Sequence, residues 1–174
     1  MKARQTNQGF TLIELLIVIA IIGLLATLAI VSLTSAQQKA RDAKRIADVK
    51  QLQNAVELYY SENAAYPDSN DATNDTWTEF AATLTSYLTN MPQDPTNSGT
   101  DAYVYGTNTA NNEYFIGAEL EADNDALDGD DDTAYDAATA GWTGLDIVQS
   151  TETAPAAVTT YDCADGSFRY CASE

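Results

Sequence analysis

Hydrophobic side chains dominate one stretch near the start of the chain. Residues 10–33 read FTLIELLIVIAIIGLLATLAIVSL, and Glu14 is the only charged residue among them. As a helix rising ~1.5 Å per residue, this stretch is ~36 Å long, which is enough to cross a bilayer. Lys2 and Arg4 precede it and most acids follow it, so the positive-inside rule places residues 1–9 in the cytoplasm and the rest outside. The alternative, a cleaved secretory signal, requires a shorter apolar region.

The helical pattern continues beyond the apolar stretch. No proline and only Gly23 interrupts the sequence up to Glu62, which predicts one helix over residues 10–62, ~80 Å long. We expect residues 10–34 to lie in the membrane or among other copies, and residues 35–62 to pack one stripe against the chain's own head. The residues that recur at helical spacing and define this stripe are Ala36, Ala40, Ala43, Ala47, Leu52, Val56 and Tyr59.

Residues 63–174 predict a small head of mixed helix and strand. A turn at Tyr66-Pro67 is followed by a polar loop, and a capping-box pattern starting at Thr76 opens a helix predicted over 77–89. Two runs, 102–106 and 113–120, predict a β-hairpin, and weaker strands are expected near 156–161 and 167–171. The predicted fold class is therefore α+β, with a long N-terminal helix packed on a small antiparallel sheet. All ten Tyr residues lie at or beyond position 59, and we expect them in the core and polar-tipped surface of the head.

Composition narrows the function. The 174 residues contain no His and two Cys, which excludes His-based catalysis and metal sites and a four-thiolate zinc site. The formal net charge of −18 repels phosphate backbones, so we predict no direct nucleic-acid binding. Seven of the eight basic side chains lie in the first fifty residues, and the head is strongly acidic. We therefore predict a protein that is not an enzyme.

Glu14 needs an explanation, because an ionised carboxylate inside hydrocarbon costs a few kcal/mol. One interpretation is that it lies near the membrane edge and reaches the headgroups. The other is a nearby amine: if the chain were cut after Gly9, the new amino group of Phe10 would lie one helical turn from Glu14, and a neighbouring copy could pair the two. The sequence leaves both interpretations open at this point.

A short basic leader ending in Gly9, then Phe10, then Glu14 five residues into the apolar run resembles the class III signal of type IV pilins and type II secretion pseudopilins. Residues 9–67 are similar to the helix and following turn of this family, although Val31 stands where many members have a kinking proline. The resemblance implies cleavage between Gly9 and Phe10 by a prepilin peptidase and N-methylation of Phe10 by the same enzyme. It also implies that Glu14 neutralises the N-terminal amine during assembly.

The implied function is that of a structural subunit. Residues 1–9 would be removed, and the mature chain would wait in the inner membrane as a single-pass protein with its head outside. An assembly platform would then polymerise it with its own copies into an extracellular or cell-surface filament. We favour a type IV pilus subunit, for adhesion, motility or DNA uptake. A major pseudopilin of a type II secretion system is the alternative, and a signal-anchored enzyme or receptor domain is a third interpretation.

Cys163 and Cys171 are predicted to form a disulfide, since an exported head lies where disulfides persist and Asp165-Gly166 favours a turn between them. Many type IV pilins have a similar C-terminal disulfide loop. The alternative is two free thiols.

We expect no required cofactor, but the stretch 121–136 holds eight acids and no base. Major pseudopilins bind calcium through a loop of the head, and five aspartates here could supply oxygen ligands to Ca²⁺. The alternative is an acidic loop that is merely solvated. The candidate ligands are Asp123, Asp125, Asp128, Asp130 and Asp132.

Overall fold

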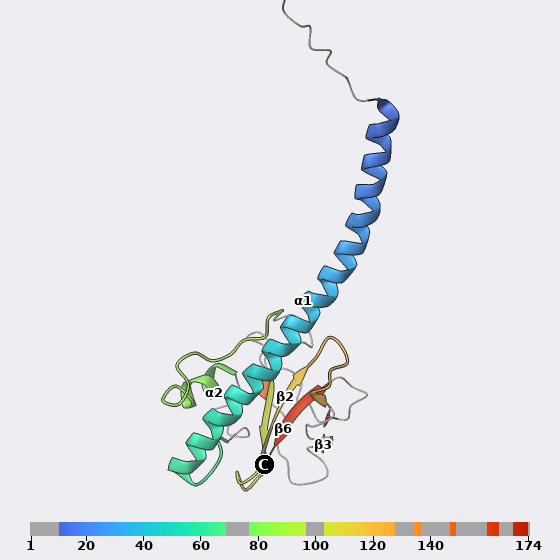
Figure 1. Cartoon of the computed structure of the whole chain (residues 1–174). Helices are drawn as coiled ribbons and strands as arrows, with labels where there is room; N and C mark the ends of the chain where they lie inside the picture. The colour runs from blue at the N-terminus through green and yellow to red at the C-terminus, as the bar shows by residue number, and fades with distance from the viewer. Residues whose placement is uncertain are drawn as a thin grey trace, which may run out of the picture. The chain divides into compact units, whose positions relative to one another are not determined.

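The fold was examined in a computed structural model, which describes residues 11–68, 77–96, 103–127, 134–136, 147–148, 160–163 and 169–173. Its first element is the helix α1, Leu12–Asn63, of 52 residues (Figure 1). The chain divides into two compact units, Met1–Gln38 and Lys39–Glu174, and α1 contributes to both. The single long helix predicted for residues 10–62 is confirmed.

The end of α1 has a defined cap. Ala64 adopts a left-handed backbone with φ of 56°, and its amide donates to the carbonyl of Tyr60 at 2.8 Å. Glycine usually occupies this position because it has no Cβ to clash. The side-chain amide of Asn63 also donates to the carbonyl of Tyr59, at 2.9 Å. These bonds satisfy backbone carbonyls that the last turn would otherwise leave unpaired.

The second helix is shorter than predicted. Helix α2 spans Trp77–Thr83, and residues 84–87 form turns instead of continuing it. Two hydrogen bonds of helical type still occur here. The Leu84 amide donates to the carbonyl of Phe80, and the Leu88 amide donates to the carbonyl of Leu84. The apolar spacing that predicted a helix to residue 89 therefore continues through turns beyond Thr83. The predicted cap, Thr76, lies outside the described residues.

The predicted hairpin is confirmed. Strand β1, Val104–Thr107, pairs antiparallel with β2, Tyr114–Glu119, and Val104 lies opposite Gly117. The loop between them contains Asn111 with φ of 51°, a conformation that asparagine tolerates. Strand β6, Arg169–Ser173, pairs with the other edge of β2, close to the strand predicted at 167–171.

Three further strands lie among the described residues of the head. Strand β4, Ile147–Val148, pairs with β1, so the main sheet has the order β4-β1-β2-β6. Strands β3, Ala134–Asp136, and β5, Thr160–Asp162, form a separate antiparallel pair. Strand β5 overlaps the strand expected at 156–161, whereas β3 and β4 were not predicted. The α+β fold with a small antiparallel sheet is confirmed.

Inside the head, α1 covers one side of the sheet (Figure 1), and the contacting face of the helix differs from the predicted one. Leu52 and Val56 are fully buried, as expected. Ala36, Ala40, Ala43 and Ala47 are exposed, so their assignment to the packed stripe is wrong. The reason is that two charged residues with buried partners take the inward positions of this part of the helix. The buried face of α1 consists of Asp42, Arg45, Val49, Leu52, Ala55 and Val56.

Aromatic rings fill the space between helix and sheet. Phe80 of α2 stacks on Tyr105 of β1, with ring centroids 4.2 Å apart. The ring centroids of Tyr66 and Tyr114 of β2 are 4.6 Å apart, and the ring of Tyr66 stacks on that of Tyr60. The hydroxyl of the buried Tyr105 donates to the carbonyl of Pro67 at 2.8 Å. The expectation that tyrosines form much of the head's core is confirmed.

Candidate functional site

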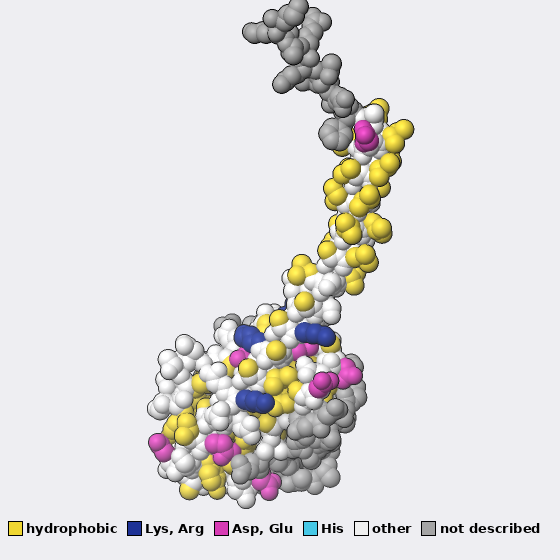
Figure 2. All heavy atoms as spheres, in the orientation of Figure 1, with side chains coloured by type: hydrophobic (Ala, Val, Ile, Leu, Met, Phe, Trp, Pro, Cys, Tyr) yellow, Lys and Arg dark blue, Asp and Glu magenta, His cyan; other side chains and the backbone are white. Residues whose placement is uncertain are grey.

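The first half of α1 presents an apolar surface with no partner inside the chain. Every residue from Thr11 to Gln37 is exposed, including Leu12 at 86% and Val31 at 71%. This part of the helix is long and apolar enough to cross a membrane. A continuous exposed apolar surface of this size marks a lipid or protein interaction site in a folded protein. Figure 2 shows these hydrophobic side chains along the helix.

Glu14, at the start of this surface, forms a capping box with Thr11. The carboxylate accepts hydrogen bonds from the Thr11 amide at 2.9 Å and from the Thr11 hydroxyl at 2.6 Å. The Thr11 hydroxyl in turn accepts from the Glu14 amide at 3.2 Å. The pattern Thr-x-x-Glu before an apolar run is a sequence signature of this cap. The interpretations of Glu14 as a membrane-edge residue or as a partner of a neighbouring amine did not include this local cap. Gly9 and Phe10 lie outside the described residues.

A second site lies within the head, where Arg45 is completely buried among carboxylates. Its Nε and Nη2 bond to Asp94 at 2.6 and 3.2 Å, and Nη1 donates to Asp42 at 2.8 Å and to Glu121 at 2.9 Å. Thr96 accepts a further hydrogen bond from Nη2 at 3.2 Å. The Arg45 cluster, as we call Arg41, Arg45 and these four residues, therefore joins α1 to two distant segments of the chain.

Arg41, one turn before Arg45, completes the cluster. Its guanidinium forms a two-bond ion pair with Glu121, and the Glu121 amide donates to the Asp42 carboxylate at 2.9 Å. The hydrogen bonds from Arg41, together with the charge of Arg45, lower the pKa of Glu121 to about 2 despite its desolvation. Burial opposes the charge of Arg45, but hydrogen bonds to Asp94 and Glu121 outweigh it and raise the Arg45 pKa. Glu121 and Arg45 are therefore both charged at neutral pH.

The cluster was not predicted from the sequence. Three carboxylates face two guanidinium groups, and the Oδ2 atom of the buried Asp42 has no hydrogen-bond partner. The only sequence signal was the i, i+3 spacing of Asp42 and Arg45, which is equally typical of an exposed helix surface. The arrangement fixes the second half of α1 to the head through side chains of Asp94, Thr96 and Glu121.

The candidate calcium ligands fall in two groups. Asp123 and Asp125 are exposed, and Asp128, Asp130 and Asp132 lie outside the described residues. In the part of the chain that the structure describes, no group of three or more His, Cys, Asp or Glu side chains is arranged to hold a metal ion. The calcium site therefore stays a prediction.

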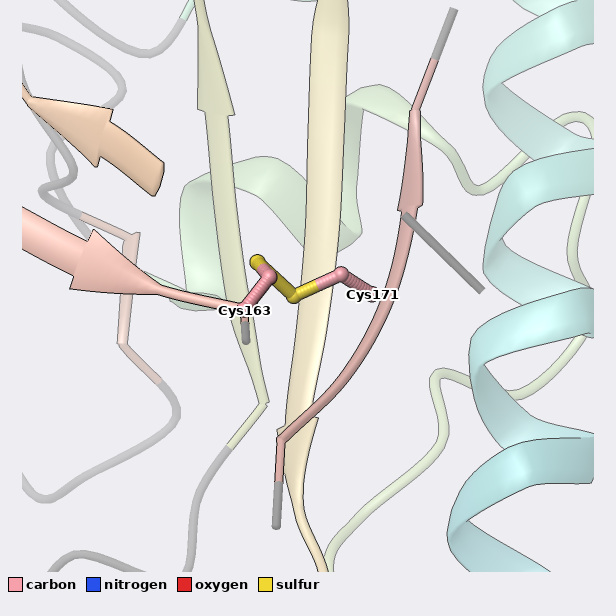
Figure 3. Close-up of a disulfide and its surroundings, with 2 residues drawn as sticks. All are labelled: Cys163 and Cys171. Carbon is pink, nitrogen blue, oxygen red and sulfur yellow. A yellow bond between two sulfur atoms is a disulfide. The ribbon is translucent and has the colours of Figure 1, made fainter. Parts of the chain in front are cut away.

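The disulfide is present, between Cys163 and Cys171 (Figure 3). Both residues are buried, and their Cα atoms are 5.9 Å apart. Cys171 lies in β6 opposite Gly117 of β2, so the bond attaches the segment after β5 to the main sheet. The prediction of a C-terminal bridge is confirmed.

An apolar helical stalk that continues into a small antiparallel head defines a pilin-like subunit. Residues 4–30 match the prokaryotic N-terminal methylation motif, a range that includes Gly9, Phe10 and Glu14. Residues 32–136 match the type II secretion system protein G family. The chain belongs to the type II secretion system protein G family.

Individual relatives agree with this assignment. The chain is 34% identical to the type II secretion system core protein G of Escherichia coli over 102 residues, which covers 55% of this chain and 70% of that protein. It is 31% identical to the core protein G of Klebsiella michiganensis, over 53% of this chain and 70% of the relative. It is also 42% identical to the type IV major pilin protein PilA of Myxococcus xanthus, over 36% of this chain and 28% of that pilin. No solved structure matches the chain.

These findings confirm the predicted membership in the pilin and pseudopilin family. They also confirm the predicted function at the level of a pilin-like structural subunit. The matched family corresponds to the predicted alternative, the secretion pseudopilin, and the relatives include a type IV pilin as well.

Proposed function

We propose that this chain is the major subunit of a type II secretion pseudopilus, a filament that grows from the membrane as its subunits polymerise. The family match over residues 32–136 and the names of the core protein G relatives support the secretion assignment. The observation that carries the proposal is the exposed apolar surface of α1 between Leu12 and Leu33. A surface this apolar needs lipid before assembly and other helices after it.

Hydrophobic burial supplies the driving force for polymerisation. At roughly 25 cal/mol for each Å² removed from water, exposed leucine, isoleucine and valine side chains along several helical turns can offset the entropy lost on assembly. Such burial is not directional, so it cannot set the axial position of one subunit against the next. The charged groups at the start of the helix provide that register.

The processing step creates the positive charge. We propose that a prepilin peptidase cleaves after Gly9 and methylates the new amine of Phe10, as the methylation motif over residues 4–30 suggests. The Glu14 carboxylate of a neighbouring subunit then pairs with this amine. Thr11 holds the Glu14 carboxylate by two hydrogen bonds before assembly, which lowers the cost of keeping it in the membrane.

Mass spectrometry of the mature N-terminus tests the processing step. We expect a chain that begins with a methylated Phe10, and Gly9→Val should accumulate uncleaved in the membrane without forming filaments. The neighbouring change Gln8→Val is the matched control and should be processed normally. A working filament whose subunits retain residues 1–9 would contradict the proposal.

The variant Glu14→Ala tests the register. It should be cleaved and methylated normally but should fail to enter filaments, because the buried amine loses its counter-charge. Ile13→Ala, which removes an adjacent apolar side chain without a charge, is the control and should assemble. Normal filament yield from Glu14→Ala would remove the proposed pairing.

A surface type IV pilus is the second candidate function. The C-terminal disulfide, which suits an exposed fibre, and the 42% identity to a type IV major pilin favour it. Deleting the gene separates the two candidates. Loss of an exported enzyme from the medium supports the secretion pseudopilus, whereas loss of long antibody-labelled surface fibres with normal secretion supports the pilus.

A further inference from the structure

The basic residues of α1 that follow its apolar half differ in whether the chain itself pairs them. Arg41 and Arg45 are paired in the Arg45 cluster, and the Lys44 ammonium donates to a backbone carbonyl of the head at 2.9 Å. Lys39 and Lys50 are exposed and have no hydrogen bond or ion pair with another described residue. These two lysines are therefore available to a group outside the chain.

Lys39 lies close to the end of the stretch that is able to span a membrane. The exposed large apolar residues run from Leu12 to Leu33, ~33 Å as a helix, which matches the ~30 Å hydrocarbon core of a bilayer. Lys39 follows Leu33 by six residues, or ~9 Å along the helix, and the headgroup region extends about 5–8 Å beyond the hydrocarbon. Because helical side chains tilt toward the helix N-terminus, the flexible Lys39 side chain is directed back toward the headgroups.

Lys50 is a comparison residue on the same helix. It follows Leu33 by seventeen residues, or ~26 Å, which is beyond the headgroup region. That distance is more than twice the Debye length of about 10 Å at 0.1 M salt. The two lysines are therefore alike in exposure and differ in their distance from a membrane that ends near Leu33.

The helix segment that contains Lys39 has an excess of positive charge. Residues 34–50 contain five bases and two acids, whereas residues 51–174 contain 23 acids and one base. The acid nearest to Lys39 along the helix, Asp42, is buried and bonded to Arg45. Nearby carboxylates on α1 therefore leave the Lys39 ammonium free to attract an anion.

We propose that Lys39 binds the phosphate of an anionic phospholipid headgroup while the subunit is held in the membrane before assembly. The proposal rests on the proposed function, because it requires α1 to span a bilayer as far as Leu33 before polymerisation. Two observations carry it: the ammonium has no partner among the described residues, and its position on the helix is at headgroup depth. The acidic head repels the same lipids, so Lys39 provides an attraction that the head lacks.

The test measures how fast single lysines are acylated in the full chain, reconstituted as a monomer in lipid nanodiscs. A water-soluble succinimidyl ester reacts only with the free amine, so a phosphate that holds the ammonium slows the reaction. We expect Lys39 to react about fivefold more slowly in discs containing phosphatidylglycerol than in discs of phosphatidylcholine alone, as quantified by mass spectrometry. Lys50 should react at the same rate in both kinds of disc.

Two further arms separate lipid from a free anion. Raising NaCl to about 0.5 M should restore the rate at Lys39 in the anionic discs, because screening weakens an exposed charge contact. Inorganic phosphate added to the phosphatidylcholine discs should give no protection. Protection by inorganic phosphate would identify a free anion as the ligand and overturn the lipid assignment.

A photoactivatable phosphatidylglycerol, with its reactive group on the headgroup, tests the contact through variants. Lys39→Gln should lower the yield of cross-links in the segment around residue 39 by about fivefold, whereas Lys39→Arg, which keeps the charge, should retain most of them. Lys50→Gln is the matched control, since it removes the same charge from an exposed position of the same helix. It should leave the yield unchanged.

Three outcomes would overturn the proposal. One is equal acylation of Lys39 in the two kinds of disc. Another is equal slowing of Lys50, which would show a general effect of membrane charge on the chain. A third is an equal loss of cross-links from Lys39→Gln and Lys50→Gln. The proposed function fails separately, because processing and filament yield of the Gly9 and Glu14 variants decide it, and the nanodisc test needs no filament.

Discussion

Arg45 is a charged side chain that the fold places entirely out of contact with water. Transferring a guanidinium to the interior costs several kcal/mol, and only well-placed carboxylates with additional hydrogen bonds offset that cost. Asp42, Asp94 and Glu121 provide them, and Thr96 accepts the remaining bond. The cluster therefore specifies one position of α1 against the head more than it adds net stability.

Removing the guanidinium should reveal this dependence. Arg45→Met is expected to lower the free energy of unfolding by about 3–5 kcal/mol, because it leaves the buried Asp42 and Asp94 carboxylates without a counter-charge. Urea unfolding of the detergent-solubilised chain, followed by tryptophan fluorescence, measures the change. Lys50→Met on the same helix is the control and should shift stability by no more than about 0.5 kcal/mol. Equal effects of the two changes would contradict the role of the cluster.

Glu121 gives the cluster a pH dependence. Its pKa falls from an ordinary value of 4.5 to about 2 in the folded chain, chiefly through its hydrogen bonds with Arg41. The lowered pKa stabilises the folded state fully above pH 4.5, and this contribution is lost as the pH falls through about 2. Glu121→Gln should therefore be less stable than the normal chain at pH 7, with a difference that narrows between pH 4.5 and 2.

Unfolding free energies measured at several pH values check this prediction. The comparison with Glu121→Gln removes the effect of other carboxylates that titrate in the same range. A stability difference between the normal chain and Glu121→Gln that does not change with pH would show that the charge of Glu121 contributes nothing and that only its packing and hydrogen bonds do.

Single residues were harder to predict than their helix. The alternation of alanine with charged residues from Ala36 to Ala47 predicted that the alanines face the head. In the structure they face outward, because Arg45 and Asp42 find partners 49 to 79 residues away in the sequence. Pairings over such separations leave no local signal. The Thr11–Glu14 cap, in contrast, is local and could have been predicted from its spacing.

At the scale of elements, the predictions succeeded where the pattern was long. Helix α1 has 52 residues without a proline, and the β1–β2 hairpin has two apolar runs joined by an Asn-rich loop. Strands β3 and β4 contain three and two residues, which is too short for an alternating pattern to emerge. Such strands form because a neighbouring strand is already in place, so the sequence pattern indicated β1, β2 and β6 of the main sheet but not its edge strand β4.

The disulfide holds β6, the last strand along the chain. Cys163 and Cys171 are eight residues apart, and closing a loop of this size reduces the entropy of the unfolded chain by an amount worth ~2.5 kcal/mol. Cys163→Ser with Cys171→Ser should lower the free energy of unfolding by about that amount. Denaturation with and without a reducing agent provides the measurement, and the double serine variant should not respond to the reductant. An unchanged stability on reduction would contradict this role.

At the scale of the whole molecule, charge is divided unevenly along the chain. The net charge of −18 comes from the head, since the first fifty residues carry more bases than acids. Heads packed in a filament would therefore repel one another at low ionic strength. The division also explains the calcium prediction, because a divalent cation would neutralise the stretch 121–136.

Calcium binding should appear as a rise in melting temperature. With Ca²⁺ at about 100 times its dissociation constant, linkage predicts ~2.7 kcal/mol of added stability, which EDTA should reverse. Equal Mg²⁺ should have a smaller effect, because it dehydrates reluctantly and demands a stricter geometry. Scanning calorimetry of the normal chain and of Asp128→Ala with Asp130→Ala provides the comparison. Melting temperatures insensitive to Ca²⁺ would leave the acidic stretch as a solvated loop.

The Arg45 cluster also has a mechanical consequence. In the proposed filament, each subunit would carry an axial load through α1. Because α1 is bonded at Arg41 and Arg45 to segments around Asp94 and Glu121, tension on the helix is shared among several strong bonds that must break together. Within the unit Lys39–Glu174, the Arg45 cluster would therefore keep α1 attached to the head under such a load.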